Sequence, residues 1–264
     1  MPIKGQRRAK KYLESVGLLE LLTKFDAESP NRITSLVKQS SNSLPISVDY
    51  IDLARLHNLV VTRKILNILE LGSGYSTLVL AHALMMNSKN QNCKLSPNLR
   101  RENPWHLDSV DESLEWSELA KSRLPKTLLS HVSFHQREVT MGAFHDRPVT
   151  YYRDLPNRAF DLLYIDGPSQ YAQAVPDWIG FNIASPERMP MSADALRIEY
   201  FLQPGTLVLF DGRRANSDFF ENNLQGKWKK RYSSKFDQTL FENRGKSLGR
   251  FNSEFLKYWG RIEF

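Results

Sequence analysis

The sequence contains almost no cysteine and no long apolar run. Cys93 is the only cysteine among 264 residues, which excludes a disulfide within the chain and a cysteine-rich metal site. The mean hydropathy is −0.45, and no apolar run approaches the roughly 20 residues that a membrane-spanning helix needs. No continuous apolar segment follows the basic N-terminus. We therefore expect no signal peptide, a reducing cytoplasmic setting and no membrane partner.

Acidic residues are fewer than basic ones, which gives a net charge of +7 and a pI near 9.4. The basic residues form two clusters, which are Lys4, Arg7, Arg8, Lys10 and Lys11 near the start and Lys227, Lys229, Lys230 and Arg231 near the end. This excess is compatible with nucleic acid or acidic substrates as partners. Charge runs more often only keep a face solvated, and the sequence leaves both interpretations open.

The first 60 residues have a helical pattern, whereas the remainder alternates between strands and helices. Residues 10–25 and 49–61 carry leucines and valines near helical spacing, which predicts one apolar stripe on each helix. These stripes must be buried against another layer. We therefore predict an N-terminal helical extension, residues 1–60, packed on a main domain of residues 61–264.

Short apolar runs bounded by turn residues predict five strands, at 65–69, 107–110, 131–135, 160–165 and 206–210. Helices are expected at 77–86, 113–123 and 192–202, with a surface loop at 87–103. Residues 228–236 and 238–242 suit a final antiparallel pair. The pattern predicts an α/β fold, with a doubly wound, mostly parallel seven-stranded sheet, a C-terminal antiparallel hairpin and added N-terminal helices.

A glycine turn follows the first predicted strand and precedes a helix. Glycines there let the main chain approach a ligand closely, as a dinucleotide or S-adenosylmethionine (SAM) would require. Thr77 occupies the place of the third glycine in a dinucleotide fingerprint. Glu70, two positions before Gly72, would repel a pyrophosphate but tolerate a sulfonium. The turn therefore favours SAM.

At this point the chain resembles the class I SAM-dependent methyltransferases. Residues 69–74 (Leu-Glu-Leu-Gly-Ser-Gly) are similar to the first motif of that family, and residues 160–168 to its fourth-strand motif. Residues 202–211 resemble its Pro-Gly turn and fifth strand, and residues 237–242 its last strand. The resemblance spans about 65–242 and points to an uncharacterised branch related to the catechol O-methyltransferase-like group.

The resemblance implies SAM as the cofactor and a set of residues that bind it. In the family the glycine loop wraps the methionine part of SAM, and an acid after the second strand, here Asp111, hydrogen-bonds the ribose. Asp111 and Glu112 could equally cap the next helix. The candidate cofactor-binding residues are Glu70, Gly72, Ser73, Gly74, Tyr75, Ser76, Asp111, Glu112 and Asp166.

The catechol-type relatives hold a divalent metal with acids that follow the fourth and fifth strands. Asp166 and Asp211 match those two places. Gly212 stands where the family has an Asn ligand, which puts a metal in doubt. Without a metal, Asp166 is the first candidate for a catalytic general base, ahead of His145 and Tyr171.

The methyl acceptor is less clearly indicated. After Asp166 the chain lacks the second proline and the aromatic residue that amino-methylating enzymes use, which favours an oxygen acceptor on a small molecule or glycan. Residues 171–191 are expected to cover the acceptor, and Arg213 and Arg214 could hold an anionic one. A nucleic-acid methyltransferase and a non-catalytic SAM-fold module remain alternatives. The sequence does not indicate an oligomeric state.

Overall fold

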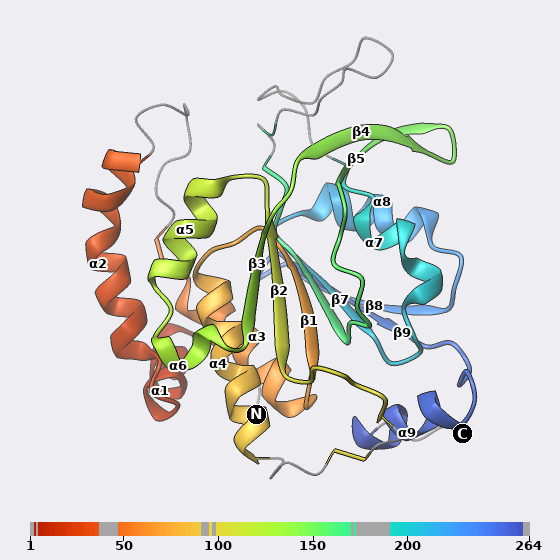
Figure 1. The fold of residues 1–264 in the computed structure, drawn as a ribbon, viewed down its shortest axis with the longest axis horizontal. Coiled ribbons are helices and arrows are strands. Elements are labelled where there is room, and N and C mark those ends of the chain that lie inside the picture. The colour runs from red at the N-terminus through yellow and green to blue at the C-terminus, as the bar shows by residue number, and fades with distance from the viewer. Residues whose placement is uncertain are drawn as a thin grey trace.

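A seven-stranded sheet forms the centre of the computed structural model (Figure 1). The structure describes residues 3, 5–36, 47–90, 95–96, 99–169, 172 and 191–260, and for residues 28–36 it describes only the backbone. The strands are β1 (Asn67–Leu71), β2 (His106–Asp111), β3 (Val132–Gln136), β6 (Leu162–Ile165), β7 (Leu207–Asp211), β8 (Trp228–Ser233) and β9 (Gln238–Asn243). Their order is β3-β2-β1-β6-β7-β9-β8. β3 through β7 in this order pair in parallel, and β9 is antiparallel to both neighbours. The predicted sheet is confirmed.

Helices cover both faces of this sheet. They are α1 (Gln6–Ser15), α2 (Leu19–Leu36), α3 (Tyr50–Thr62), α4 (Tyr75–Asn90), α5 (Leu114–Ser122), α6 (Lys126–Leu129), α7 (Asp194–Arg197), α8 (Arg214–Asn223) and α9 (Arg250–Tyr258), with a short 3₁₀ helix η2 at Glu199–Phe201. Asp49 caps α3 by accepting bonds from the N–H groups of Ile51 and Asp52. Within the described ranges, no helix has both the length and the apolarity to cross a bilayer.

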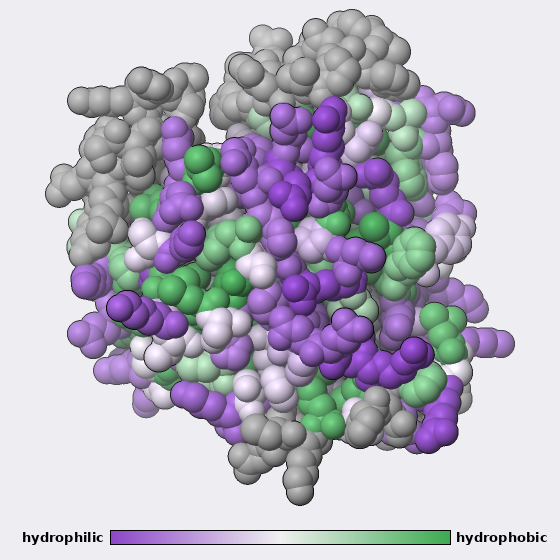
Figure 2. Space-filling model, in the orientation of Figure 1, coloured by the Kyte–Doolittle hydropathy of each residue, from purple (hydrophilic) through white to green (hydrophobic). Residues whose placement is uncertain are grey.

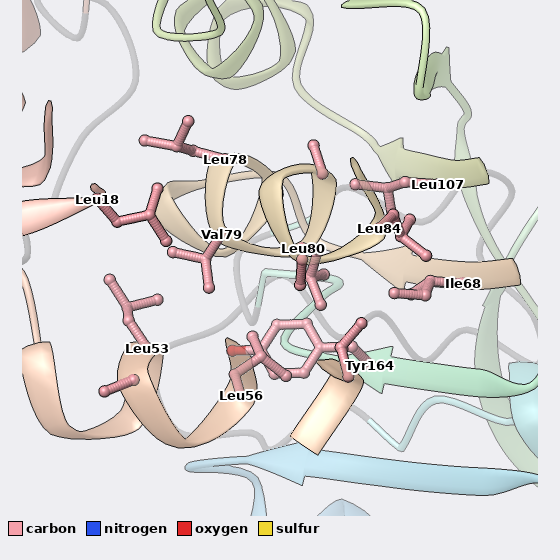
Figure 3. Close-up of a cluster of buried hydrophobic side chains, with 14 of the residues drawn as sticks. Leu18, Leu53, Leu56, Ile68, Leu78, Val79, Leu80, Leu84, Leu107 and Tyr164 are labelled. Atoms are coloured by element: carbon pink, nitrogen blue, oxygen red, sulfur yellow. The ribbon is translucent and has the colours of Figure 1, made fainter. Parts of the chain in front are cut away.

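Neighbouring residues of each strand point to opposite faces, so each buried strand feeds two cores. On one face, Ile68 of β1 and Tyr164 of β6 lie in a core with Leu56 of α3 and Leu80 of α4. Figure 3 shows α4 lying across this core, with Val79 and Leu80 directed at α3 and Leu84 beside Ile68 of β1. On the other face, Leu69 and other strand residues pack with α8.

Three expectations about helices need correction. Residues 10–25 do not form one helix, because Gly17 (φ +78°) interrupts the chain between α1 and α2. Residues 192–202 form the short α7 followed by η2 rather than one helix. The predicted loop at 87–103 begins later, since α4 continues to Asn90.

The sequence reading also missed a hairpin. Strands β4 (Val139–Phe144) and β5 (Arg147–Tyr152) form a separate two-stranded antiparallel sheet. Its two-residue turn, His145 and Asp146, has φ values of 48° and 60°. Such turns are usually marked by Asn-Gly or Asp-Gly, and neither is present here.

A partly buried polar chain of side chains joins the N-terminal helices to α4. Tyr12 Oη of α1 lies 2.7 Å from His57 Nδ1 of α3, and His57 Nε2 lies 3.0 Å from His82 Nδ1 of α4. Burial lowers the pKa of His57 to about 3 and that of His82 to about 4. The contact ties the first 60 residues to α4, although the division at residue 60 itself stays a prediction.

This polar chain should make stability depend on pH. The unfolded state takes up a proton at His57 below about pH 6.5, whereas the folded state does not until about pH 3, so stability is lost as pH falls through this window. We expect the parent to lose roughly 2 kcal/mol more than His57→Gln between about pH 7 and pH 5. Urea unfolding of both proteins at the two pH values measures this difference. An equal loss would show that His57 does not titrate as described.

Candidate active site

The strand order brings the loops after β1 and β6 together at the point where it reverses direction. A Cβ added to Gly72 would lie 2.8 Å from Gly167 N and 2.9 Å from the carbonyl carbon of Asp166. Gly72 also has φ +95°, which side chains rarely allow. The two main chains can touch only because both positions are glycine. Carboxyl ends of strands at such a reversal are where open α/β sheets bind ligands.

Hydrogen bonds to acceptors at the end of β2 hold the glycine loop, and the described residues leave the loop open beside Gly74. Gly72 N donates to Val110 O at 2.8 Å, and Ser73 N donates to Asp111 Oδ2 at 2.6 Å. Among the residues that the structure describes, a Cβ on Gly74 would meet only Ser76 Oγ, at 4.0 Å. Space therefore remains beside Gly74 for a ligand to approach the main chain.

Glu70 is fully buried beneath this loop. Its carboxylate accepts hydrogen bonds from the hydroxyls of Ser76 (2.6 Å), Thr77 (2.7 Å) and Ser109 (2.6 Å). Burial raises the pKa of Glu70 to about 7, while the three hydroxyls oppose the rise. Glu70 thus links β1, β2 and the first turn of α4, which fixes the geometry of the glycine loop between them.

The raised pKa of Glu70 predicts an opposite pH effect to that of His57. The folded state keeps the Glu70 proton up to about pH 7, whereas the unfolded state loses it near 4.5, so this stability is present at low pH and lost as pH rises. Compared with Glu70→Gln, the parent should lose roughly 3 kcal/mol between about pH 4.5 and pH 8. Urea unfolding of the parent and of Glu70→Gln at both pH values measures this loss. A difference in unfolding free energy between the two proteins that does not change with pH would contradict the raised pKa of Glu70.

The two acids after β2 hold loops in place. Asp111 uses its second oxygen to accept a bond from Ser113 N at 2.8 Å. Burial, with the charge of Glu112, raises its pKa to about 7. Glu112 accepts from Tyr152 Oη at 2.7 Å and from Ser169 N at 2.8 Å. Asp111 therefore connects the glycine loop to the start of α5, and Glu112 connects the chain after β2 to the chain after β6.

Asp166 is the accessible carboxylate of this region. Its side chain is 54% exposed, yet the surrounding protein is close enough for burial to raise its pKa to about 7, with Asp211 adding to the rise. Arg213 opposes the rise, since its Nε lies 3.9 Å from Asp166 Oδ1. Arg213 also donates to Pro168 O at 2.6 Å, so it braces the loop that carries Asp166.

Asp211 is oriented by two neighbours and does not fit the metal site considered from sequence. Tyr164 Oη donates to Asp211 Oδ2 at 2.6 Å, and Gln238 Nε2 donates to Oδ1 at 3.2 Å. Gly212 supplies no side-chain ligand. Among the residues that the structure describes, no three His, Cys, Asp or Glu side chains are grouped to hold a metal ion.

Helix α3 adds a carboxylate that sequence reasoning missed. Burial and the neighbouring charge of Asp211 raise the pKa of Asp52 to about 7. Arg55, whose Nη1 is 3.9 Å from Asp52 Oδ1, lies over the Phe236 ring at 3.8 Å. Nothing in the sequence signals that Asp211 acts on Asp52, because 159 positions separate the two acids.

The remaining residues that the sequence suggested for the site do not join Asp166 and the glycine loop among the described residues. Arg214 Nε is 3.7 Å from Asp218 of its own helix, and its guanidinium lies over the Tyr232 ring, so it does not share the position of Arg213. His145 is exposed in the β4–β5 turn. Tyr171 and most of the predicted cover at 171–191 lie outside the described residues.

The sheet order, the glycine loop and the acid at the end of β2 together define a class I SAM-dependent methyltransferase fold. A family model described as a methyltransferase domain matches residues 69–212. That range is more than half of the chain and runs from β1 to the residue after β7. The chain belongs to the methyltransferase domain family, and it is by class a SAM-dependent methyltransferase.

Two solved structures share this fold. Cofactor-bound Rv0187 from MTB is 14% identical, with a TM-score of 0.50, covering 92% of this chain and 99% of that one. The Podospora anserina methyltransferase PaMTH1, solved with S-adenosylhomocysteine (SAH), is also 14% identical with a TM-score of 0.50, covering 85% and 88%. Among curated proteins, none matches this sequence significantly.

Proposed function

We propose that the chain binds SAM at the loop after β1 and transfers its methyl group to a hydroxyl oxygen of a small-molecule or glycan-like acceptor. The observation that carries this proposal is the contact between Gly72 and the Asp166–Gly167 main chain. This contact places the exposed carboxylate of Asp166, whose pKa is about 7, beside the glycine loop. A base near neutral pKa suits the removal of a hydroxyl proton.

The predicted cofactor-binding residues divide into two roles in this proposal. Gly72, Ser73, Gly74 and Tyr75 would contact the cofactor directly, since the main chain beside Gly74 is open. Asp111, Glu112 and Asp166 would line the same edge of the sheet. Glu70 and Ser76 bond to each other inside the protein, and we assign them to positioning the loop.

The residues around Asp166 account for the transfer step. SAM supplies a methyl group on a positively charged sulfur, which leaves as a neutral thioether. Asp166 takes the acceptor's hydroxyl proton while the new carbon–oxygen bond forms and the carbon–sulfur bond breaks, with its electron pair left on sulfur. Arg213 favours the ionised form of Asp166 that this step needs.

A thermal-shift series with SAM, SAH, NAD and ATP tests cofactor binding, because a ligand that binds only the folded state raises the melting temperature. SAM and SAH should stabilise the parent, and NAD and ATP should not. Asp111→Ala should lose the response, since Ser73 N loses its acceptor. Glu115→Ala, at an exposed position of α5, serves as the control. A larger shift with NAD or ATP would refute the proposal.

The acceptor is tested with methyl-labelled SAM and matched panels of phenols, sugars and amines. We expect label on hydroxyl compounds and not on amines. SAH binding with no transfer to any hydroxyl compound would refute the acceptor assignment and favour a non-catalytic SAM-binding module. In this proposal residues 1–60 are a helical layer added to the methyltransferase domain of residues 61–264.

A further inference from the structure

Tyr152, the last residue of β5, is fully buried against the loops of the candidate site. Its phenol oxygen donates to Glu112 Oε2 at 2.7 Å. A Cβ added to Gly167 would lie 2.5 Å from the same phenol oxygen and 2.8 Å from Gly72 N. One side chain of the β4–β5 hairpin therefore reaches the main-chain contact between Gly72 and Gly167.

Glu112 connects Tyr152 to the chain after β6. Its other oxygen, Oε1, accepts a hydrogen bond from Ser169 N at 2.8 Å. The two oxygens of this carboxylate thus have donors from two different segments, β5 and the chain after β6. Ser169 follows Asp166 by three positions, so Glu112 restrains the loop that carries the candidate base.

Tyr152 can support these loops because it is itself held in place. Its N–H donates to Asp194 Oδ1 at 2.9 Å, and Asp194 Oδ2 accepts from Ser192 Oγ at 2.6 Å. Tyr152 also belongs to the core that includes Val110 of β2. Burial, and after it the charge of Glu112, raises the pKa of Tyr152. The phenol therefore keeps its proton and remains a donor at neutral pH.

We propose that Tyr152 positions the cofactor site, acting through Glu112 and Gly167 on the main chain beside Gly72. It is a positioning residue, because the groups it contacts belong to the protein. The inference rests on the proposed function and deepens it, since it makes the β4–β5 hairpin a part of the SAM site.

The hairpin stands where the fold usually has another element. In doubly wound sheets a helix commonly joins successive parallel strands. All of residues 137–161, between β3 and β6, are described, and they form the β4–β5 hairpin without a helix. The proposal gives this departure a role in binding the cofactor.

A purely structural role of Tyr152 is the alternative that the test must separate. Tyr152 adds nothing to the molecular surface, and hydrophilic side chains run across the centre of the face drawn in Figure 2. Tyr152→Phe therefore leaves the surface intact and removes one buried oxygen. Tyr12→Phe is the matched control, because Tyr12 Oη also lies 2.7 Å from its partner, His57 Nδ1 of α3.

Calorimetric titration with SAH compares the full chain of the parent, Tyr152→Phe and Tyr12→Phe. Tyr152→Phe should weaken SAH binding about fivefold or more, because the loops beside Gly72 lose one of their supports. Tyr12→Phe should keep an SAH affinity within about twofold of the parent. Urea unfolding should show a lower midpoint for both variants, so that stability alone does not explain a difference in affinity.

Amide hydrogen exchange at Ser169 reports on the connection through Glu112. In the ¹⁵N-labelled full chain without SAH, this amide should exchange about fivefold faster or more in Tyr152→Phe, and at the parental rate in Tyr12→Phe. Glu112→Ala removes the shared acceptor. Adding Tyr152→Phe to Glu112→Ala should change SAH affinity by less than about twofold further, because the two side chains act in series.

The outcomes separate this inference from the proposed function. No SAH binding by the parent would overturn both. An SAH affinity equal to that of the parent in Tyr152→Phe would overturn the inference alone. So would equal weakening by Tyr12→Phe, because a general loosening of the protein would then explain the loss. Fully additive effects of Tyr152→Phe and Glu112→Ala would also overturn it, because the phenol would then not act through Glu112.

Discussion

Replacing Gly72 by Ala is expected to destabilise the protein by about 2–4 kcal/mol and to remove SAH binding. The new Cβ would lie 2.8 Å from Gly167 N and 2.9 Å from the Asp166 carbonyl carbon, and these are main-chain atoms that cannot rotate away. The residue would also carry a φ of +95°. The melting temperature should fall by roughly 5 °C or more, as calorimetry would measure.

Gly74→Ala separates stability from binding at the same loop. Of the described residues, only Ser76 would meet the new Cβ, with its Oγ at 4.0 Å, so stability should change by less than about 0.5 kcal/mol. The methyl group would nevertheless occupy the open side of the loop, and SAH affinity should fall about tenfold or more. Parent-like SAH affinity in this variant would mean that the loop does not contact the cofactor.

Asp166→Asn is expected to slow methyl transfer by about 10²–10⁴-fold, the range for loss of a general base. Asn keeps the shape of the side chain but cannot take the acceptor's proton. SAH affinity should change less than about tenfold. In the parent, the rate should rise with pH through about 7, because only the ionised carboxylate acts as a base. The variant should lose this dependence.

The control for this substitution is Asp218→Asn on α8. Asp218 pairs with Arg214 and Lys230 away from Asp166 and should affect neither the rate nor its pH profile. The measurement is initial rate against pH with an acceptor from the hydroxyl panel. A rate within threefold of the parent for Asp166→Asn, about 0.7 kcal/mol, would remove Asp166 from the mechanism.

The parts of the fold that are encoded locally were predictable. The run Ile68-Leu69 has neighbouring side chains buried on opposite faces, and such continuous apolar runs are typical of buried parallel strands. The β4–β5 hairpin was not predictable, because His145 and Asp146 adopt positive φ without a glycine signal. The break at Gly17 was concealed by leucines that keep helical spacing on both sides of it.

The candidate site, too, could be predicted from the sequence only in part, because its long-range contacts could not. Asp111 and Asp166 could be located because each follows a recognisable strand. The closeness of Gly72 to Gly167 depends on strand order, which puts β6 beside β1 despite the long chain between them. Asp52 approaches Asp211 only after α3 packs on the sheet. Such long-range contacts leave no periodic signal in the sequence.

The most direct test of the account is an NMR titration of the ¹⁵N-labelled full chain with SAH, followed at assigned backbone amides. Shifts concentrated at Gly72, Ser73, Gly74 and Tyr75, and at the amides flanking Asp111, are the predicted result. A saturable response confined to other parts of the chain, or no response at SAH concentrations that saturate related enzymes, would contradict the claim that this loop holds the cofactor.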